Sequence, residues 1–163
     1  MLLVRVISSD DWPEWRRLRR EALRESPDAF DSVLADWSGP GDTEQRWRNR
    51  LNAVSLNLVA DLDGVAVGMI SRTEVVNQKA ELISMWVAPE ARRRGVGEAL
   101  IRAVVDHARD DGAVTVVLDV NLENRQAIAL YERCGFVDGG WATNQARQPQ
   151  RRRMQLQIVT ERS

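Results

Sequence analysis

The sequence predicts an α/β fold, with a mixed, mainly antiparallel sheet of six to seven strands and helices on both faces of the sheet. Strand-like segments come first as hairpins and then alternate with helix-like segments, which is the order typical of such a sheet. An Asp63-Gly64 pair between two early strands favours a tight hairpin turn. The apolar run over 114–120 shows little alternation, as in a strand covered on both faces. The length of 163 residues predicts a single domain over residues 1–163.

The N-terminal segment predicts a strand followed by an amphipathic helix. The strand is expected over 4–7, and residues 8–13 carry a helix start, with serine or aspartate as cap and a proline in the first turn. The helix then places arginines on its outer sides and an apolar group on one side. That group is Trp15, Leu18, Ala22 and Leu23.

The next segment, 27–37, is expected to add a short second helical piece that ends at the Gly-Pro-Gly sequence of 39–41. Helical and strand patterns follow in order. A helix is expected over 43–51, and strands over 55–60, 65–74 and 80–87.

The C-terminal half alternates helices with strands. The predicted helices cover 98–110, which Gly112 stops, and 124–133, which Gly135 closes. The predicted strands cover 114–120, 136–138 and 153–159, and a polar loop covers 142–150.

Composition excludes several classes of function. The 23 Lys plus Arg and 24 Asp plus Glu residues give a net charge of -1, so the long-range field for nucleic-acid or anionic-membrane binding is missing. One cysteine and one histidine make a metal site improbable. No apolar run approaches the ~20 residues that span a bilayer. We therefore expect a cytoplasmic protein with no metal and no nucleic-acid or membrane partner.

The segment from Met85 to Gly97, MWVAPEARRRGVG, predicts a strand end, a loop and the first turn of a helix. Such a junction exposes unpaired backbone N–H groups and the positive end of the helix dipole, which together can bind an anion. A solvated basic turn is the alternative. A dinucleotide motif would need glycine where Leu100 stands, and a Walker A loop would need lysine where Glu98 stands.

Two motifs resemble those of the GNAT N-acetyltransferase superfamily. The first is Arg-x-x-Gly-x-Gly over 92–97, which is similar to the coenzyme A pyrophosphate loop of that family. The second is Asn-x-x-Ala-x-x-x-Tyr-x-x-x-Gly-Phe over 124–136, in the expected order after the first. The resemblance is specific over about 80–136 and implies a GNAT-like fold and acetyl-CoA as the acetyl donor.

The resemblance implies roles for backbone groups around the donor. A bulge in the strand over 80–87 would leave the Met85 N–H to face the thioester oxygen, and Val87 would pair with the pantetheine amides like an added strand. The pyrophosphate would lie on the amides of Arg92, Arg93, Arg94, Gly95, Val96, Gly97 and Glu98.

The resemblance also implies catalytic side chains. An alkyl amine with a pKa of about 10.4 is less than roughly one part in a thousand neutral at pH 7, so a base is useful, and Glu81 is the candidate. Glu81 and Met85 are about 13 Å apart along the strand, so we expect Glu81 to act through ordered water. Tyr131 would protonate the departing thiolate, and Asn124 would bind the pantetheine arm. An ordinary strand glutamate and a core tyrosine are the alternatives.

Other conspicuous residues favour structural roles. His107 and Cys134 are expected to be packing residues, and the arginines over 151–153 a solvated strand start. Core packing is expected for Trp37, Trp86 and Trp141, with lining of an acceptor cleft as the alternative.

The predicted function is acetyl transfer from acetyl-CoA to a primary amine of a small molecule or a protein. The alternative is a non-catalytic coenzyme A sensor or protein-interaction module on the same fold. The segments 27–37 and 139–150 are expected to shape the acceptor site, and a homodimer is compatible with the sequence.

Overall fold

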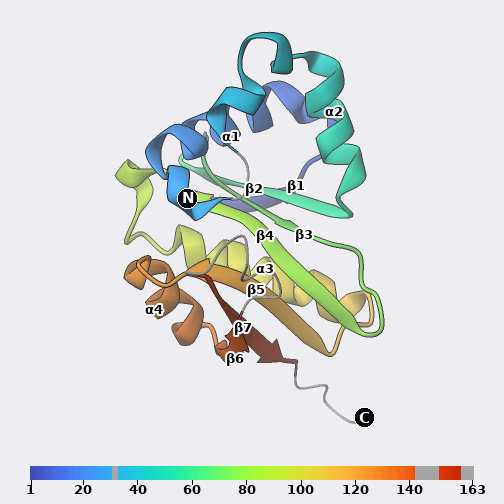
Figure 1. The fold of residues 1–163 in the computed structure, drawn as a ribbon, viewed down its shortest axis with the longest axis vertical. Helices are drawn as coiled ribbons and strands as arrows, with labels where there is room; N and C mark the ends of the chain where they lie inside the picture. Colours follow the sequence, from blue (N-terminus) through green and yellow to red (C-terminus); the bar gives the residue numbers. More distant parts are fainter. Residues whose placement is uncertain (31–32, 142–150, 159–163) are drawn as a thin grey trace.

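The computed structural model describes residues 1–30, 33–141 and 151–158. In this part of the chain, seven strands form one sheet in the order β1-β2-β3-β4-β5-β7-β6 (Figure 1). The strands are β1 (Leu2–Val6), β2 (Leu56–Leu62), β3 (Val65–Arg72), β4 (Lys79–Val87), β5 (Thr115–Asn121), β6 (Val137–Trp141) and β7 (Arg151–Gln157). The α-helices are α1 (Trp12–Glu25), α2 (Glu44–Ala53), α3 (Val96–Asp110) and α4 (Arg125–Arg133).

The sheet is antiparallel except at one junction. Strands β1 to β4 form consecutive antiparallel pairs, and β5, β7 and β6 do the same. Strands β4 and β5, which α3 connects, run parallel. The prediction of a mixed, mainly antiparallel sheet of six to seven strands is therefore confirmed.

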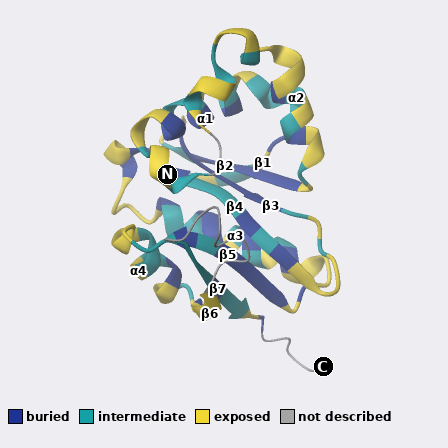
Figure 2. Cartoon of the chain, in the orientation of Figure 1, coloured by how far each residue is buried: buried dark blue, intermediate teal, exposed yellow. Residues whose placement is uncertain are grey.

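Helices cover both faces of the sheet, as predicted. On one face, Val96 and Leu100 of α3 lie against Gly68 of β3. Ser71, three residues further along β3, faces the opposite side because side chains alternate along a strand, and there it binds Arg50 of α2. Figure 2 shows the buried sides of the helices turned toward the sheet and their exposed sides turned outward.

Helix α1 follows the predicted pattern closely. The Ser8 side chain accepts a hydrogen bond from the Asp10 N–H, and the Ser8 N–H donates to Asp11, which fixes the helix entry. The predicted apolar group is buried beneath the helix: Trp15, Leu18, Ala22 and Leu23. Each large side chain of this group stabilises the fold by about 1.5–3 kcal/mol.

The turn between β2 and β3 confirms the hairpin prediction. Asp63 and Gly64 both have positive φ, at 52° and 84°, as a type I′ turn requires. Strand β5 is also as expected, because residues 115–118 are all buried, on both faces of the sheet.

The structure corrects one predicted element. Residues 27–37 were expected to continue as a helical piece, but the described part of this segment forms two single 3₁₀ turns, Pro27–Ala29 and Leu34–Trp37. Ser26 leaves the helical region with φ -133° and ψ 63°, and the proline that follows it disfavours helical backbone at Ser26. Other predicted boundaries differ by a few residues, and the predicted loop 142–150 lies outside the described residues.

Candidate active site

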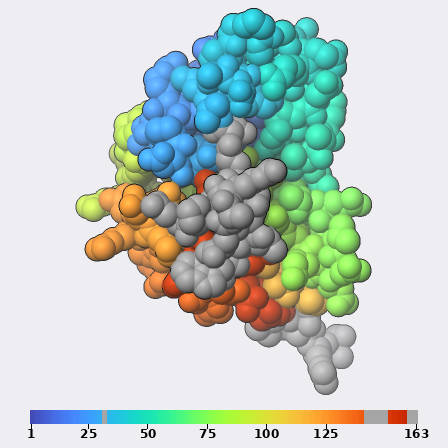
Figure 3. Space-filling model, in the orientation of Figure 1, coloured from blue at the N-terminus to red at the C-terminus, as the bar shows by residue number. Residues whose placement is uncertain are grey.

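The sheet opens between its two antiparallel parts. Strands β4 and β5 pair over residues 79–81 and 115–117, and in the described residues their register goes no further. Both strands continue beyond this point, β4 to Val87 and β5 to Asn121. A cavity of about 820 Å³ lies here, lined by residues of β4, β5, α3 and α4, and by Arg19 of α1, Arg50 of α2 and Arg151 of β7. Figure 3 shows the N-terminal helical layer at one end of the molecule, in blue and cyan, and α4 at the side below it, in orange.

Strand β4 carries the bulge that the resemblance implied. Met69 of β3 is opposite Trp86, and Ser71 is opposite Ile83, so three residue steps on β4 face two on β3. Ser84, within the bulge, has φ of 57°, a left-handed conformation that is strained for a residue other than glycine. The bulge spans Ser84 and Met85, and Met85 lines the cavity.

The glycine loop leads into α3 as predicted. Gly95 has φ of 82° and is the residue before the helix, in a conformation that glycine adopts without strain. No side chain caps α3, so the N–H groups of its first turn have no partner within the helix. Gly95, Val96, Gly97 and Glu98 all line the cavity. This end of the cavity can therefore bind an anion.

Gly97 is needed for space. A Cβ at this helical position would lie 2.7 Å from Leu130 of α4 and 3.1 Å from Met85 of β4. The absence of a side chain therefore lets α3 lie close to both α4 and β4, at the wall of the cavity.

The three arginines of the loop differ in their surroundings. All three are exposed, but the Arg92 guanidinium donates to Glu25 Oε2 at 2.8 Å and to the Val87 carbonyl at 3.0 Å. Burial alone would raise the pKa of Glu25, but hydrogen bonds from Arg92, Ser26 and Trp86 lower it to about 2. The Arg92 side chain thus joins the loop to the end of α1.

Helix α4 places Tyr131 against the cavity. The residue is 6% exposed, its ring packs edge-on against Phe136 at 5.8 Å, and it lines the cavity. Burial raises the pKa of the Tyr131 hydroxyl well above its usual value, so this group keeps its proton at neutral pH. At the start of the same helix, the Asn124 side chain accepts a hydrogen bond from the Ala127 N–H at 3.2 Å and caps the helix.

Glu81 lies on the opposite face of the sheet from α3. It shares this face with Ile83, which pairs with Ser71 beneath α2. Glu81 pairs with Val117 of β5, and Asp119 is two residues further along that strand. Asp119 therefore lies on the same face as Glu81, and it also lines the cavity. Asp119 accepts a hydrogen bond from Arg153 at 3.0 Å, and this bond raises the pKa of Arg153. Glu81 also raises the pKa of Arg153, but by less than Asp119 does.

The cavity therefore joins two different environments through the gap between β4 and β5. The α3 side offers backbone N–H groups and the protonated Tyr131, and the α2 side offers carboxylates and arginines. The arrangement can hold an anionic ligand on one side and a polar second ligand on the other.

Several functional candidates were missed by sequence reasoning: Glu25, Arg50 and Asp119. Arg50 carried a signal, because it follows Trp47 by three residues and so shares the buried side of α2 with it. Asp119 is an acid within an otherwise apolar strand, which is a signal of the same kind. Glu25 had no local signal, since its partners are distant in the sequence.

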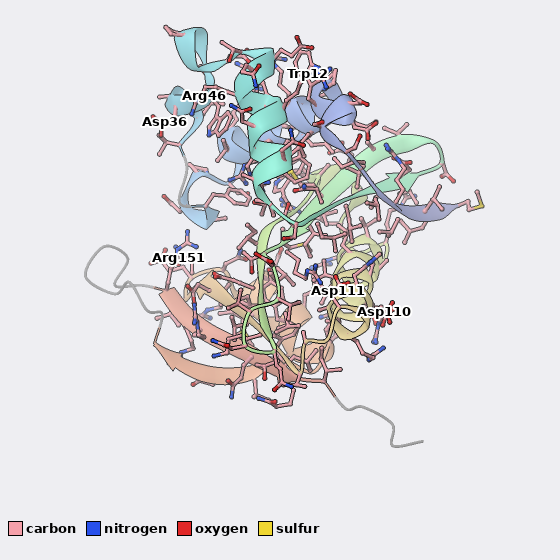
Figure 4. The ribbon with its side chains drawn as sticks, turned by 90° about the vertical axis from the view of Figure 1, so that its right-hand side faces the viewer. Trp12, Asp36, Arg46, Asp110, Asp111 and Arg151 are labelled. Atoms are coloured by element: carbon pink, nitrogen blue, oxygen red, sulfur yellow. The ribbon has the colours of Figure 1, made fainter. Side chains whose placement is uncertain are left out.

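The structure corrects the interpretation of the arginines over 151–153. They are half-buried, Arg153 binds Asp119, and Arg152 binds Asp138 at 3.1 Å. Arg151 lies at the end of β7 that faces the α1 and α2 layer and lines the cavity (Figure 4).

The predicted packing residues behave largely as expected. Trp86 is 4% exposed, and Trp37 packs on Trp47 with ring centroids 4.4 Å apart. Trp86 also lines the cavity. His107 and Cys134 are half-buried. The side chain of Trp141 lies outside the described residues.

Two kinds of feature are absent from the described residues. They contain no group of three or more histidine, cysteine, aspartate and glutamate side chains that could hold a metal ion. Within the same residues, no helix has the length and apolar character needed to cross a membrane.

Comparison with known proteins identifies the family. The family model described as "Acetyltransferase (GNAT) family" matches residues 12–136. A [ribosomal protein bS18]-alanine N-acetyltransferase of Salmonella typhimurium is 41% identical over 83 residues, which are 51% of this chain and 54% of that protein. The chain thus spans about half the length of this curated relative.

Two further similarities extend over more of the chain. A phosphinothricin N-acetyltransferase of Alcaligenes faecalis is 31% identical over 146 residues, 84% of this chain and 71% of that protein. The crystal structure of PaiA N-acetyltransferase from Thermoplasma acidophilum in complex with coenzyme A has the same fold, with a TM-score of 0.77 at 18% identity over 97% of this chain and 99% of that one. The chain belongs to the GNAT acetyltransferase family.

Proposed function

We propose that this protein is an acetyl-CoA-dependent N-acetyltransferase that transfers acetyl directly to a primary amine of a small molecule or a protein. The observation that carries the proposal is the gap between β4 and β5, which joins an anion-binding helix start and a protonated tyrosine to a carboxylate on the far face of the sheet. The relatives support it, because their names describe acetylation of a ribosomal-protein alanine and of phosphinothricin.

The residues of the α3 side fit coenzyme A. The backbone from Arg92 to Glu98 would hold the pyrophosphate, with Gly95 and Gly97 leaving the approach open. Asn124 and the β4 backbone at Val87 would bind the pantetheine arm. The Val87 carbonyl already accepts a hydrogen bond from Arg92, so its second lone pair is the one available.

Acetyl-CoA supplies an acetyl group already activated as a thioester, and the protein supplies three further functions. Glu81 accepts a proton from the ammonium form of the acceptor through water, which leaves a neutral amine to attack the carbonyl carbon. The Met85 N–H donates a hydrogen bond to the oxyanion that forms. A C–N bond forms, the C–S bond breaks, and Tyr131 donates its proton to the departing sulfur. The nitrogen loses its second proton as the amide forms, and that proton returns to Tyr131 through solvent. These roles require no metal ion.

The test is the release of coenzyme A thiol from acetyl-CoA in the presence of amine acceptors. The panel contains amino acids, diamines, aminoglycosides and peptides with free N-termini, and each product is checked for a new amide. Amine-dependent thiol release supports the proposal. Tight binding of acetyl-CoA without transfer to any amine would instead favour a coenzyme A sensor or a protein-interaction module.

Location and partners follow the same proposal. We expect a cytoplasmic enzyme, in keeping with a requirement for acetyl-CoA, with no nucleic-acid or membrane partner. The net charge of -1 supports the absence of a nucleic-acid partner. A homodimer is compatible with this function, and the transfer does not require one.

A further inference from the structure

Arg50 is a cation that helix α2 directs into the sheet. Its guanidinium donates to Asn57 Oδ1 at 3.1 Å, to Ser71 Oγ at 3.2 Å and to Ser84 Oγ at 3.1 Å. These three acceptors belong to β2, β3 and β4, and all three are neutral. The guanidinium also lies 5.1 Å from the centre of the Trp15 ring.

The surroundings of Arg50 do not balance its charge. Burial lowers the pKa of its guanidinium to about 10, so the group is still protonated at neutral pH. Two arginines nearby do have carboxylate partners. Arg92, which lines the cavity, binds Glu25, and Arg153 binds Asp119, which lines the cavity. Arg50 has no carboxylate partner among the described residues. A half-buried cation without an anion is unfavourable, and a bound anion would relieve this.

Arg50 lines the same cavity as the proposed catalytic groups. It lies on the α2 face of the sheet with Glu81, whereas the pyrophosphate-binding helix start is on the α3 face. An anion at Arg50 would therefore belong to the acceptor and not to coenzyme A. Three of the five guanidinium N–H groups have partners among the described residues, which leaves two for a ligand.

The position of Arg50 also limits the distance between the anion and the reacting amine. Arg50 binds Ser84, and the next residue is Met85, whose N–H faces the thioester oxygen in the proposed function. One strand residue spans about 3.3 Å, so the anion would lie within a few bonds of the nitrogen that is acetylated. An α- or β-amino carboxylate has this spacing. The N-terminal residue of an unmodified peptide has an amide in place of that carboxylate.

We propose that the acetyl acceptor is a small amine with a carboxylate close to its nitrogen, as in a free amino acid, and that Arg50 binds this carboxylate. The inference rests on the proposed N-acetyltransferase function. It makes Arg50 a residue that determines acceptor specificity, in addition to its hydrogen bond with the strained bulge at Ser84.

The experiment compares free L-amino acids with their carboxamides as acceptors, by initial rates of thiol release. Each pair differs in the charge that Arg50 would bind, so the unaltered enzyme should show kcat/KM roughly 10- to 100-fold higher for the acid of the preferred pair. In Arg50→Gln, the kcat/KM values of the acid and its carboxamide should differ by less than about 3-fold, mainly because the KM of the acid rises. Arg50→Lys should restore part of the preference because it restores the charge.

Arg48→Gln is the matched control. Arg48 lies on the same helix, binds Asp10 and Glu44, and does not line the cavity, so its loss removes an equal charge and should leave the acid preference unchanged. A purely structural role of Arg50 at the bulge predicts a different result, in which Arg50→Gln lowers kcat/KM equally for acids and carboxamides.

The possible outcomes separate this inference from the function on which it rests. Equal use of acids and carboxamides, an acid preference that survives Arg50→Gln, or acetylation confined to diamines or peptide N-termini would overturn the inference and leave the N-acetyltransferase function standing. Absence of thiol release with every class of amine would overturn the function itself. If Arg50→Gln does not fold, the comparison in the unaltered enzyme still tests the acceptor class, and Arg50→Lys still tests the role of Arg50.

Discussion

Tyr131 combines two properties that a proton donor in this site needs. It lines the cavity between the splayed strands, and burial raises the pKa of its hydroxyl, so the proton is in place at any physiological pH. The same burial makes the hydroxyl a weaker acid. A thiolate formed beside Tyr131 would be desolvated as well, which raises its affinity for the proton.

Replacing Tyr131 with phenylalanine should therefore affect the chemical step and not donor binding. We expect Tyr131→Phe to lower kcat by about 10²- to 10⁴-fold, with the Kd for acetyl-CoA changed by less than about 3-fold, since the ring packing against Phe136 is kept. Steady-state rates and calorimetric titration measure the two quantities. Unchanged turnover would remove Tyr131 from the mechanism.

Glu81 gives a prediction that depends on pH. If it deprotonates the acceptor, Glu81→Gln should lower kcat/KM at pH 7 by about 10²-fold or more. The deficit should shrink as the pH rises toward the acceptor pKa of about 10, because solvent then supplies the neutral amine. The measurement is a pH profile of kcat/KM for both proteins. A deficit that stays constant up to pH 10 would contradict a role as base.

At the scale of elements, the end of α1, strand β4 and the glycine loop meet at one carboxylate. Glu25 accepts hydrogen bonds from Trp86 of β4 and from Arg92 of the loop. The end of α1, strand β4 and the loop are thus connected through a single side chain. A loop that is held in this way is in position before its ligand arrives, which lowers the entropic cost of binding.

The Glu25 carboxylate should also make stability depend on pH. Its pKa is about 2 in the folded protein and about 4.5 in the unfolded chain, so the unfolded state binds the proton first as the pH falls. The stabilisation is fully present above about pH 5.5 and is lost as the pH falls from there toward 2. With about a third of the side chain exposed, we expect Glu25→Gln to lower the free energy of unfolding by about 1–2 kcal/mol at pH 7.

Denaturant unfolding of both proteins at pH 7 and at pH 3 tests this prediction. The difference between the two proteins should be smaller at pH 3. Asp10→Asn is a matched control, because Asp10 is a carboxylate in an exposed ion pair with Arg48 outside the cavity. A Glu25→Gln effect that is equal at both pH values would show that the charge of Glu25 does not stabilise the fold.

The elements that the sequence predicted well are those with local signals. The hairpin at Asp63-Gly64, the apolar stripe of α1 and the glycine before α3 each follow from a few neighbouring residues. The segment 27–37 has no such signal, and its described part forms two 3₁₀ turns that contact α1.

The site was predictable only in part for the same reason. Tyr131 and the loop over 92–97 lie within sequence motifs, and the structure brings both to one cavity. Arg50 and Glu25 act through contacts between residues that are 34 and 67 positions apart, to Ser84 and Arg92. Such contacts depend on the register of the whole sheet, which no local pattern specifies.

At the scale of the whole molecule, the fold consists of two antiparallel parts joined by a short parallel junction. Only residues 79–81 and 115–117 are in register there, so the sheet parts beyond them and creates the cavity that both faces share. The proposed function depends on that division, because it lets donor and acceptor approach from opposite faces and meet between the strands.

A crystal structure with coenzyme A bound tests this central claim most directly. We predict that the pyrophosphate lies on the N–H groups between Arg92 and Glu98, the pantetheine arm between β4 and β5, and the sulfur within hydrogen-bonding distance of the Tyr131 hydroxyl. Coenzyme A bound elsewhere, or bound with its sulfur away from Tyr131 and from the gap between the strands, would contradict the claim.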